Sequence, residues 1–435
     1  MIRMKSIPLL PIAPGRHNQP MTYTRSFRVP LLLLSLSTLI SGCGPEAENG
    51  SAALDSLAME VPAAPGSTSP NLAAGPDDRL ILSWLEPDDS GHRLQYSILE
   101  GERWSSPETV ARGDNWFVNW ADFPSVVPIS ATLRAAHWLV RQPAGGYAYD
   151  VLFSKSRDGG NTWSDPVKPH EDGTPTEHGF VTVFPHSSDV GLVWLDGRNM
   201  SDEWAPDGPI KGMTLRTATF AEGMAIANEA QIDGLTCDCC QTDVAVTDAG
   251  PVAVYRDRTT DETRDIYIAR HVNGGWQRGR PVADDGWIIG GCPVNGPVIA
   301  ADGDHLAVAW FTSANDEPRV RLARSSDGGE SFLPPLDISD GETFGRAGIA
   351  MLNDGDVAVS WLCKAADETV NVCLRRVSSD DQLAPVHVLS GDHDVPSMSV
   401  PQLARSGDFL FAAWTVSDGD EKRIEGSRIA IGSLR

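Results

Sequence analysis

The sequence predicts an all-β fold: a β-propeller of four-stranded blades, with seven blades favoured and six as the alternative. An alternating apolar segment that ends in an aromatic residue recurs along the chain. These landmark residues are Trp84, Trp138, Trp194, Tyr255, Trp310, Trp361 and Trp414. They are spaced by 54, 56, 61, 55, 51 and 53 residues. A two-residue period is typical of strands, and four strands in a repeat of this length indicate a propeller blade.

Residues 1–42 have the pattern of an export signal. The apolar run from Val29 to Ile40 follows Arg25 and Arg28 and is too short to span a bilayer. The sequence Ile-Ser-Gly-Cys at residues 40–43 resembles the bacterial lipobox, and that resemblance implies lipidation of Cys43. Met21 is an alternative start of the signal. We therefore expect an exported protein anchored by lipid to the cell envelope, with the outer membrane or the periplasmic face favoured.

Residues 43–69 are rich in Ala, Pro, Gly and Ser and are expected to form a flexible tether. The propeller is expected at residues 70–435. Its seventh repeat ends after about three strands, so another segment must supply a fourth strand to close the ring. The segment from Asp55 to Pro62 is the candidate for this closing strand.

The chain carries 59 acidic and 35 basic residues, a net charge of -24. Such a surface repels polyanions, which excludes nucleic acid as a partner. Contact with a membrane is expected through the lipid anchor only.

Two turns match the pattern Ser-x-Asp-x-Gly-x-Thr/Ser-aromatic, at residues 156–163 and 325–332. They resemble the Asp-box of the sialidase-like (BNR repeat) propellers. The resemblance implies that Asp158 and Asp327 are structural and lie on the face away from the ligand. It also raises the possibility of a sialidase, which uses three Arg, a Tyr nucleophile supported by a Glu, and an Asp acid/base.

Two departures count against the full sialidase machinery. The first inner strand, residues 70–74, lacks the Phe/Tyr-Arg-Ile-Pro motif, and no Tyr follows Tyr267. A glycoside hydrolase of the exo-sialidase type would need a rearranged site.

The opposite face of the propeller is expected to hold the ligand site. Asp122, His178 and Cys239 stand sixteen residues before their landmark aromatic residues, and Cys237 and Cys292 stand eighteen before theirs. Equal offsets on a repeat place residues at similar heights around the central channel. We therefore expect a site at one mouth, for a glycan or another carboxylate-bearing ligand.

Arg guanidinium groups suit a carboxylate, and Trp and Asn suit a sugar. The expected ligand-binding residues are Asn119, Trp120, Arg198, Arg256, Arg258, Arg264 and Asn295. The candidate catalytic residues are Asp122, Asp196, Tyr255 and Asp257.

Six cysteines remain besides Cys43. Cys363 and Cys373 flank a predicted turn symmetrically and are expected to form a cross-strand disulfide. The other four are Cys237, Cys239, Cys240 and Cys292. Disulfides between the loops of neighbouring blades are favoured for them, with a redox-active thiol as another interpretation. A copper or zinc site that includes His178 is a further alternative, because thiolate and imidazole suit these metals.

Overall fold

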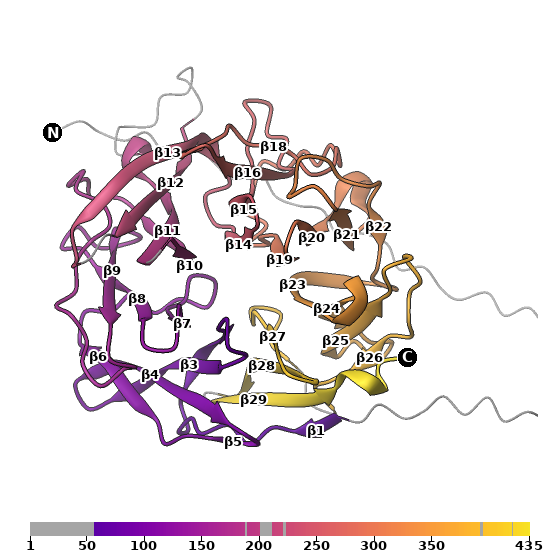
Figure 1. Ribbon diagram of the computed structural model, residues 1–435, viewed down its shortest axis with the longest axis horizontal. Helices are drawn as coiled ribbons and strands as arrows, with labels where there is room; N and C mark the ends of the chain where they lie inside the picture. The colour runs from indigo at the N-terminus through magenta and orange to yellow at the C-terminus, as the bar shows by residue number, and fades with distance from the viewer. Residues whose placement is uncertain (1–55, 188, 201–210, 221–222, 392–394, 420) are drawn as a thin grey trace, which may run out of the picture. The chain divides into compact units, whose positions relative to one another are not determined.

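The computed structural model describes residues 56–435, except 188, 201–210, 221–222, 392–394 and 420. In this part of the chain, seven antiparallel sheets follow one another around a central axis (Figure 1). The predicted β-propeller is confirmed, with seven blades rather than six. The expected signal peptide and Cys43 lie outside the described residues. None of the described helices is long and apolar enough to cross a bilayer.

The first three blades follow one another in chain order. Blade 1 consists of β2 (Thr68–Ala74), β3 (Leu80–Asp88), β4 (Gly91–Glu100), β5 (Arg103–Trp104) and β6 (Glu108–Gly113). Blade 2 consists of β7 (Ser125–Pro128), β8 (Arg134–Arg141) and β9 (Tyr149–Ser156). Blade 3 consists of β10 (His178–His186), β11 (Asp189–Asp196), β12 (Met213–Phe220) and β13 (Ile226–Thr236). In blade 2 the bridge between Phe153 and Val167 stands where a fourth strand is expected.

Blades 4 to 7 continue the same pattern. Blade 4 consists of β14 (Asp243–Thr247), β15 (Gly250–Arg256), β16 (Ile266–Val272), β17 (Gly275–Trp276) and β18 (Arg280–Pro281). Blade 5 consists of β19 (Val298–Asp302), β20 (His305–Thr312), β21 (Arg319–Ser325) and β22 (Leu336–Asp337). Blade 6 consists of β23 (Thr343–Met351), β24 (Val357–Lys364), β25 (Val370–Val377) and β26 (His387–Val388). Blade 7 consists of β27 (Gln402–Ser406), β28 (Phe409–Asp418), β29 (Glu421–Ala430) and, from the other end of the propeller, β1 (Ser56–Ala58).

Four short 3-10 helices lie in the connections of the described residues. They are η1 (Arg198–Met200), η2 (Ala314–Asp316), η3 (Asn353–Gly355) and η4 (Ile431–Ser433).

The strand β1 completes blade 7 by pairing antiparallel with β29. It lies within the segment expected to close the ring. The chain then runs on along blades 7 and 1, where Met59, Val61 and Ala63 pack against their shared apolar core. Residues 43–69, expected to be a tether with a possible closing strand, thus contribute β1 and the segment after it to the propeller.

The landmark aromatic residues explain why the repeat exists. Each lies on the second strand of its blade and packs against the preceding blade. Trp361 of blade 6 contacts the cluster that contains Ala307 and Val320 of blade 5, and Trp84 of blade 1 contacts that of Phe411 in blade 7. A large ring buried in every seam contributes strongly to the apolar area removed from water.

The two Asp-box turns follow the third strands of blades 2 and 5. In the first, Asp158 accepts hydrogen bonds from the Thr162 amide at 2.9 Å and the Thr162 hydroxyl at 2.7 Å. In the second, Asp327 accepts the same pair of bonds from Ser331, at 2.9 and 2.5 Å. Both carboxylates hold a turn together, as the structural role predicted for them requires.

Candidate functional site

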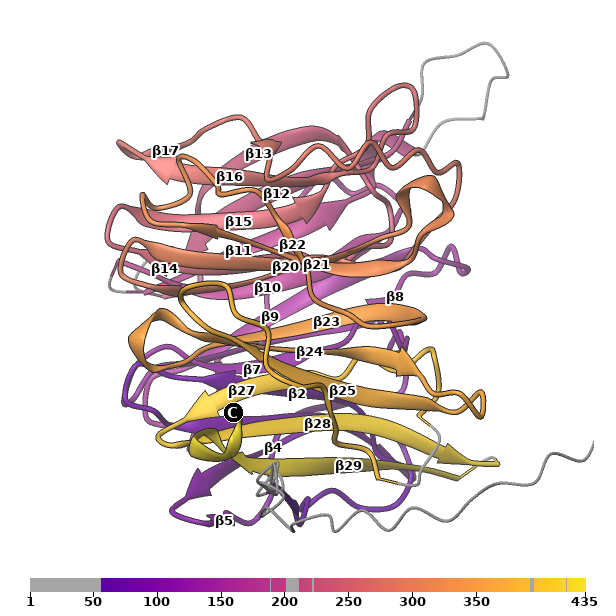
Figure 2. The same cartoon turned by 90° about the vertical axis from the view of Figure 1, so that its right-hand side faces the viewer.

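The connections of each blade lie on two faces, because the strands run from one face of the ring to the other (Figure 2). The segments leading into each inner strand share a face with the connections between second and third strands. The pairing of His178 with Asp196, at the start of β10 and the end of β11, is one instance. We call this face the upper mouth; the Asp-box turns lie on the other.

The central channel is a cavity of ≈ 540 Å³ lined by the inner strands of all seven blades. Asp122 and Arg346 line it. Of the four candidate catalytic residues, Asp122 is the one that reaches this cavity. Asp196, Tyr255 and Asp257 are buried elsewhere.

Arg346 is the most informative side chain at the upper mouth. Its guanidinium carbon lies 5.0 Å from the centre of the Trp120 ring, across the channel between blades 2 and 6. Its Nη1 donates to the carbonyl oxygens of Pro293 and Val294, and its Nε is buried without a hydrogen-bond partner. Among the described residues, no carboxylate forms an ion pair with it. Burial without a compensating acid lowers the pKa of Arg346 to about 10.

The backbone holds Arg346 in an unusual conformation. Its φ is 57°, a backbone angle that residues other than glycine rarely adopt. Its amide donates to Asn295 Oδ1 at 2.7 Å, and the Asn295 amide nitrogen donates to the carbonyl of Phe344 at 3.1 Å. The side chain of Asn295, expected to bind ligand, is buried, and its hydrogen bonds hold the segment that carries Arg346.

Asn119 and Trp120 line a second cavity of ≈ 290 Å³ at the same mouth. Asn119 Oδ1 accepts a hydrogen bond from the amide of Ala121 at 2.8 Å, which fixes the loop that carries Trp120. The indole ring therefore stands between this cavity and the guanidinium of Arg346.

Asp122 belongs to a buried cluster with Tyr149 and Glu177. The Tyr149 hydroxyl lies 2.6 Å from Asp122 Oδ2 and 2.8 Å from Glu177 Oε1. It has one proton to donate, so both bonds require that one carboxyl group be protonated. Desolvation by burial raises the pKa of Asp122 to about 7 and that of Glu177 to about 8. An added Cβ on Gly179 would lie 1.9 Å from Asp122 Oδ2, so only glycine fits there.

The four arginines expected to bind ligand are not among the residues that line the central channel. Arg198 binds Asp196 at 2.6 Å, and Arg258 and Arg264 both bind Glu262, at 2.6 and 2.8 Å.

Arg256 is buried and donates to three backbone carbonyls, those of Asn295, Arg264 and Phe311. The physical reason is common to the four arginines. The connection between second and third strands lies one strand outward from the channel, where acids and carbonyls of the same or the neighbouring blade accept their hydrogen bonds.

The side chain of Tyr255 is likewise engaged in a contact within the protein. Its hydroxyl donates to Asp233 Oδ2 at 2.6 Å, and the side chain is fully buried. Desolvation by burial raises the pKa of Asp257 to about 7, but this carboxyl group does not line the channel. Neither Tyr255 nor Asp257 lines the central channel together with Asp122.

Two disulfides are present among the described residues. Cys363–Cys373 joins β24 and β25, as the sequence predicts. Cys239–Cys292 ties the loop before blade 4 to the loop before blade 5. Cys237 and Cys240 are buried free thiols. The Cys239–Cys292 bond thus joins two of the four sulfurs that the metal alternative would use as ligands, and Cys237 and Cys240 remain as thiols.

His178 lies in a different cluster from the cysteines. Its Nε2 is 3.1 Å from Asp172 Oδ2, and its ring stacks on His170 with the ring centres 3.8 Å apart. Asp150 and Asp196 complete this buried group. The structure therefore places His178 in a group of histidine and aspartate side chains apart from the group of Cys237, Cys239 and Cys240.

Arg346 was missed by counting from the landmarks at offsets of sixteen and eighteen. It stands fifteen residues before Trp361, and Asn295 stands fifteen before Trp310. The pairing of β23 with β24 shifts register on either side of Gly345. Asn295 is among the predicted residues, and extending the count to the offset of fifteen in blade 6 would have found Arg346 as well.

No protein-family profile matches this chain, and no curated protein matches its sequence. A protein of unknown function from Dyadobacter fermentans is 14% identical with a TM-score of 0.47, over 86% of this chain and 98% of that one. A variant of NanB sialidase from Streptococcus pneumoniae is 12% identical with a TM-score of 0.44, over 85% and 69%.

A variant of an α-L-arabinofuranosidase from Fusarium graminearum is 11% identical with a TM-score of 0.49, over 85% and 94%. Likenesses at 11–14% identity concern the fold and not the reaction.

Proposed function

We propose that the propeller binds a carboxylate-bearing ligand, with an acidic glycan as the favoured class, at the upper mouth of its channel. One observation carries the proposal: Arg346 lines the channel with a half-buried guanidinium whose Nε has no hydrogen-bond partner and which no carboxylate of the described residues neutralises. A buried charge is costly unless an opposite charge accompanies it. A ligand carboxylate supplies that charge.

The surroundings of Arg346 support a sugar acid rather than a bare ion. The Trp120 ring offers an apolar face beside the guanidinium, and the cavity that it lines adds room next to the channel. Stacking on an aromatic face and a bond to a carboxylate are complementary contacts for one acidic sugar.

The test is calorimetric titration with N-acetylneuraminic acid, galacturonic acid and neutral galactose. We expect at least one acid to bind and the neutral sugar to bind at least about tenfold more weakly, since a charged hydrogen bond contributes about 1.5–3 kcal/mol. Arg346→Ala should abolish the preference for the acid. Arg405→Ala, which removes a guanidinium from the other end of the channel, is the matched control and should leave it unchanged. Binding that ignores the charge of the sugar, no binding at all, or binding unaffected in Arg346→Ala would refute the proposal.

Hydrolysis of an acidic glycan is the second candidate, and Asp122 favours it. This carboxyl group lines the same channel, and burial raises its pKa to about 7, a value suited to a general acid at neutral pH. Against it, the nearby Tyr149 hydroxyl is buried and held by two carboxyl groups, so it is a poor nucleophile. A fluorogenic sialoside decides the matter. Release by the native protein that is lost in Asp122→Asn supports hydrolysis, and no release by the native protein rejects it.

The proposed location is the cell envelope, through lipid on Cys43. The support is the apolar run and the Ile-Ser-Gly-Cys pattern before and at this residue. The Cys43→Ser variant should lose incorporation of radiolabelled fatty acid and move from the membrane fraction to the aqueous one. An unchanged distribution of this variant counts against the anchor.

A further inference from the structure

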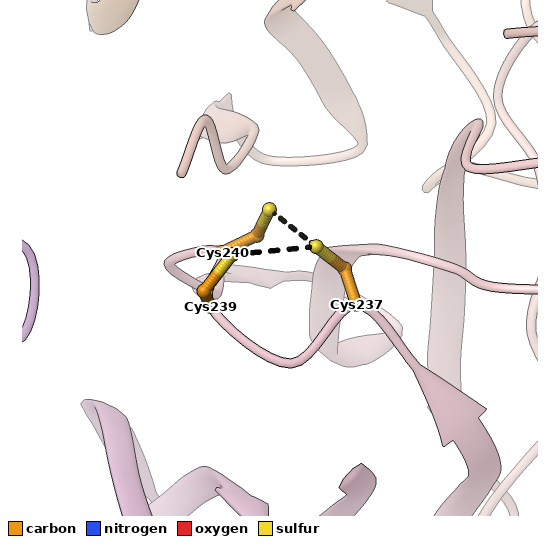
Figure 3. Close-up of side chains that lie close together, drawn as sticks. All are labelled: Cys237, Cys239 and Cys240. Atoms are coloured by element: carbon orange, nitrogen blue, oxygen red, sulfur yellow. Dashed lines mark hydrogen bonds between the residues drawn. The ribbon is translucent and has the colours of Figure 1, made fainter. Parts of the chain in front are cut away.

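Cys237 and Cys240 form a close pair of thiols in the loop between β13 and β14. Their sulfur atoms lie 2.7 Å apart (Figure 3). Two residues separate them, and both side chains are buried. A disulfide needs sulfur atoms about 2.05 Å apart, so a shift of under an ångström would join them.

The two thiols sit in different electrostatic surroundings. Arg264 Nη1 donates to Cys237 Sγ at 3.5 Å. Burial by itself raises the pKa of Cys237, but the Cys240 thiol and the charges on Arg256 and Arg264 together lower it to about 7. Burial raises the pKa of Cys240 well above its ordinary value despite Arg256 nearby. Near neutral pH the pair therefore holds one thiolate and one thiol, an arrangement suited to thiol–disulfide exchange.

The Cys239–Cys292 disulfide lies between the two thiols and the surface of the protein. Cys237 Sγ lies 3.9 Å from Cys239 Sγ, and Cys239 is bonded to Cys292. Cys292 is exposed at the upper mouth, whereas Cys237 is not. An external compound can reach the disulfide although it cannot reach the thiolate behind it.

We propose that Cys237 and Cys240 are a redox-active dithiol that exchanges electrons with external disulfides through the Cys239–Cys292 disulfide. This activity goes beyond ligand binding at Arg346 and does not depend on it. The substrate class is a disulfide of a small thiol or of a protein segment that reaches the upper mouth.

The exchange proceeds in three balanced steps. The Cys237 thiolate attacks Cys239 Sγ, which forms the Cys237–Cys239 bond and releases Cys292 as a thiolate. The Cys240 thiol then loses its proton to solvent and attacks Cys237 Sγ, which forms Cys237–Cys240 and releases Cys239 as a thiolate. Finally Cys239 and Cys292 reduce the external disulfide and re-form their own bond. Two electrons have passed from the dithiol to the external disulfide, which leaves as two thiols or thiolates.

The test uses the full chain in buffers with varied ratios of reduced to oxidised glutathione, followed by alkylation and peptide mass spectrometry. We expect Cys237 and Cys240 to be alkylated in reducing buffer and protected as a disulfide in oxidising buffer, reversibly. The Cys363→Ser/Cys373→Ser variant, which removes the distant disulfide, is the control and should exchange at the native rate.

Two further variants test the route. Cys239→Ser/Cys292→Ser keeps the dithiol but removes the relay, so exchange with glutathione should slow by at least about tenfold, as buried thiols react only when reached. Arg264→Gln should raise the pH at which the Cys237 thiolate absorbs in the ultraviolet; a pKa higher by about one cuts the thiolate fraction about tenfold at pH values well below the pKa.

Three results would overturn the proposal. One is a pair that stays reduced in oxidised glutathione or stays oxidised in reduced glutathione. Another is an unchanged rate in Cys239→Ser/Cys292→Ser. The third is near-stoichiometric copper or zinc in the purified protein that protects both thiols from alkylation.

Discussion

A single tyrosine hydroxyl at the upper mouth is shared by two carboxyl groups, and this makes the stability of the propeller depend on pH. Burial raises the pKa of Asp122 to about 7, whereas an unfolded aspartate has a pKa of about 3.9. The folded state thus holds a proton that the unfolded state loses between about pH 4 and pH 7. The contribution of Asp122 to the free energy of unfolding is fully present below about pH 4 and is lost as the pH rises to about 7.

Replacing Asp122 with Asn should remove this dependence. A pKa that differs by one between the folded and unfolded states corresponds to about 1.4 kcal/mol. We therefore expect the free energy of unfolding of the variant relative to native protein to improve by roughly 2–4 kcal/mol between pH 5 and pH 8. Urea unfolding at the two pH values measures it. Asp89→Asn, at an exposed position, should give no difference between them. If Asp122→Asn has the same stability relative to the native protein at both pH values, Asp122 does not hold an extra proton in the folded state.

At the scale of residues, spacing along the chain brought one of the predicted side chains, Asp122, to the central channel, whereas the predicted arginines lie outside it. The offset of sixteen placed Asp122 on the channel, because that residue sits directly before an inner strand. Arg346 was not predicted because it stands fifteen residues before Trp361, outside the offsets of sixteen and eighteen that were counted. Arg198 and Arg258 are fully paired with acids, and such pairing depends on packing that spacing along the chain does not encode.

At the scale of elements, the Asp-box turns act as clamps that fix the third strand to the chain that follows it. Asp327 accepts three hydrogen bonds, two from Ser331 and one from the Ser325 hydroxyl at 2.7 Å. The bonds from the Ser331 hydroxyl and amide hold its pKa below the usual range. The clamp is therefore present above about pH 4 and weakens as the pH falls below that.

We expect Asp327→Ala to lower the free energy of unfolding by about 1–2 kcal/mol, because it deletes the acceptor of a turn. Ligand binding at the upper mouth should be unchanged, since the turn lies on the other face. Glu330→Ala changes an exposed side chain in the same turn and is the matched control for thermal unfolding. Equal stability of the two variants would show that the turn holds without its carboxylate.

The blade repeat could be predicted from the sequence because every blade meets the same local packing requirement. Each landmark aromatic residue must fill a seam against the preceding blade, so Trp194 and Trp310 recur at nearly constant spacing. The disulfide Cys363–Cys373 was readable for the same reason, since both cysteines flank one hairpin. The pairing of Cys239 with Cys292 joins two different blades and could not be chosen from spacing alone.

At the scale of the whole molecule, one sheet holds both ends of the propeller together. The strand β1 pairs with β29, and the following segment continues the contact, with Met59 donating to the carbonyl of Gly426 at 2.9 Å and Gly66 to that of Lys422 at 2.8 Å. A propeller without this strand leaves an open edge on blade 7.

A chain that begins at Ser67 should therefore unfold at a lower temperature than one that begins at Ala52. The shorter chain loses the apolar contacts of Met59 and Val61 and the hydrogen bonds to the carbonyls of Gly426 and Lys422. Its free energy of unfolding should therefore be lower by about 3 kcal/mol or more. Differential scanning calorimetry of the two chains measures the difference. Identical unfolding temperatures would mean that the ring is held closed by the remaining seams alone.

The joining of β1 to β29 also sets an order of events during biosynthesis. The strand Ser56–Ala58 leaves the ribosome before any other part of the propeller, yet its neighbour Glu421–Ala430 is made almost last. Early blades can begin to form as they emerge, but the circle stays incomplete until translation has nearly ended. A ribosome stalled anywhere before codon 421 should thus present a protease-sensitive N-terminal strand that becomes protected only in the finished polypeptide.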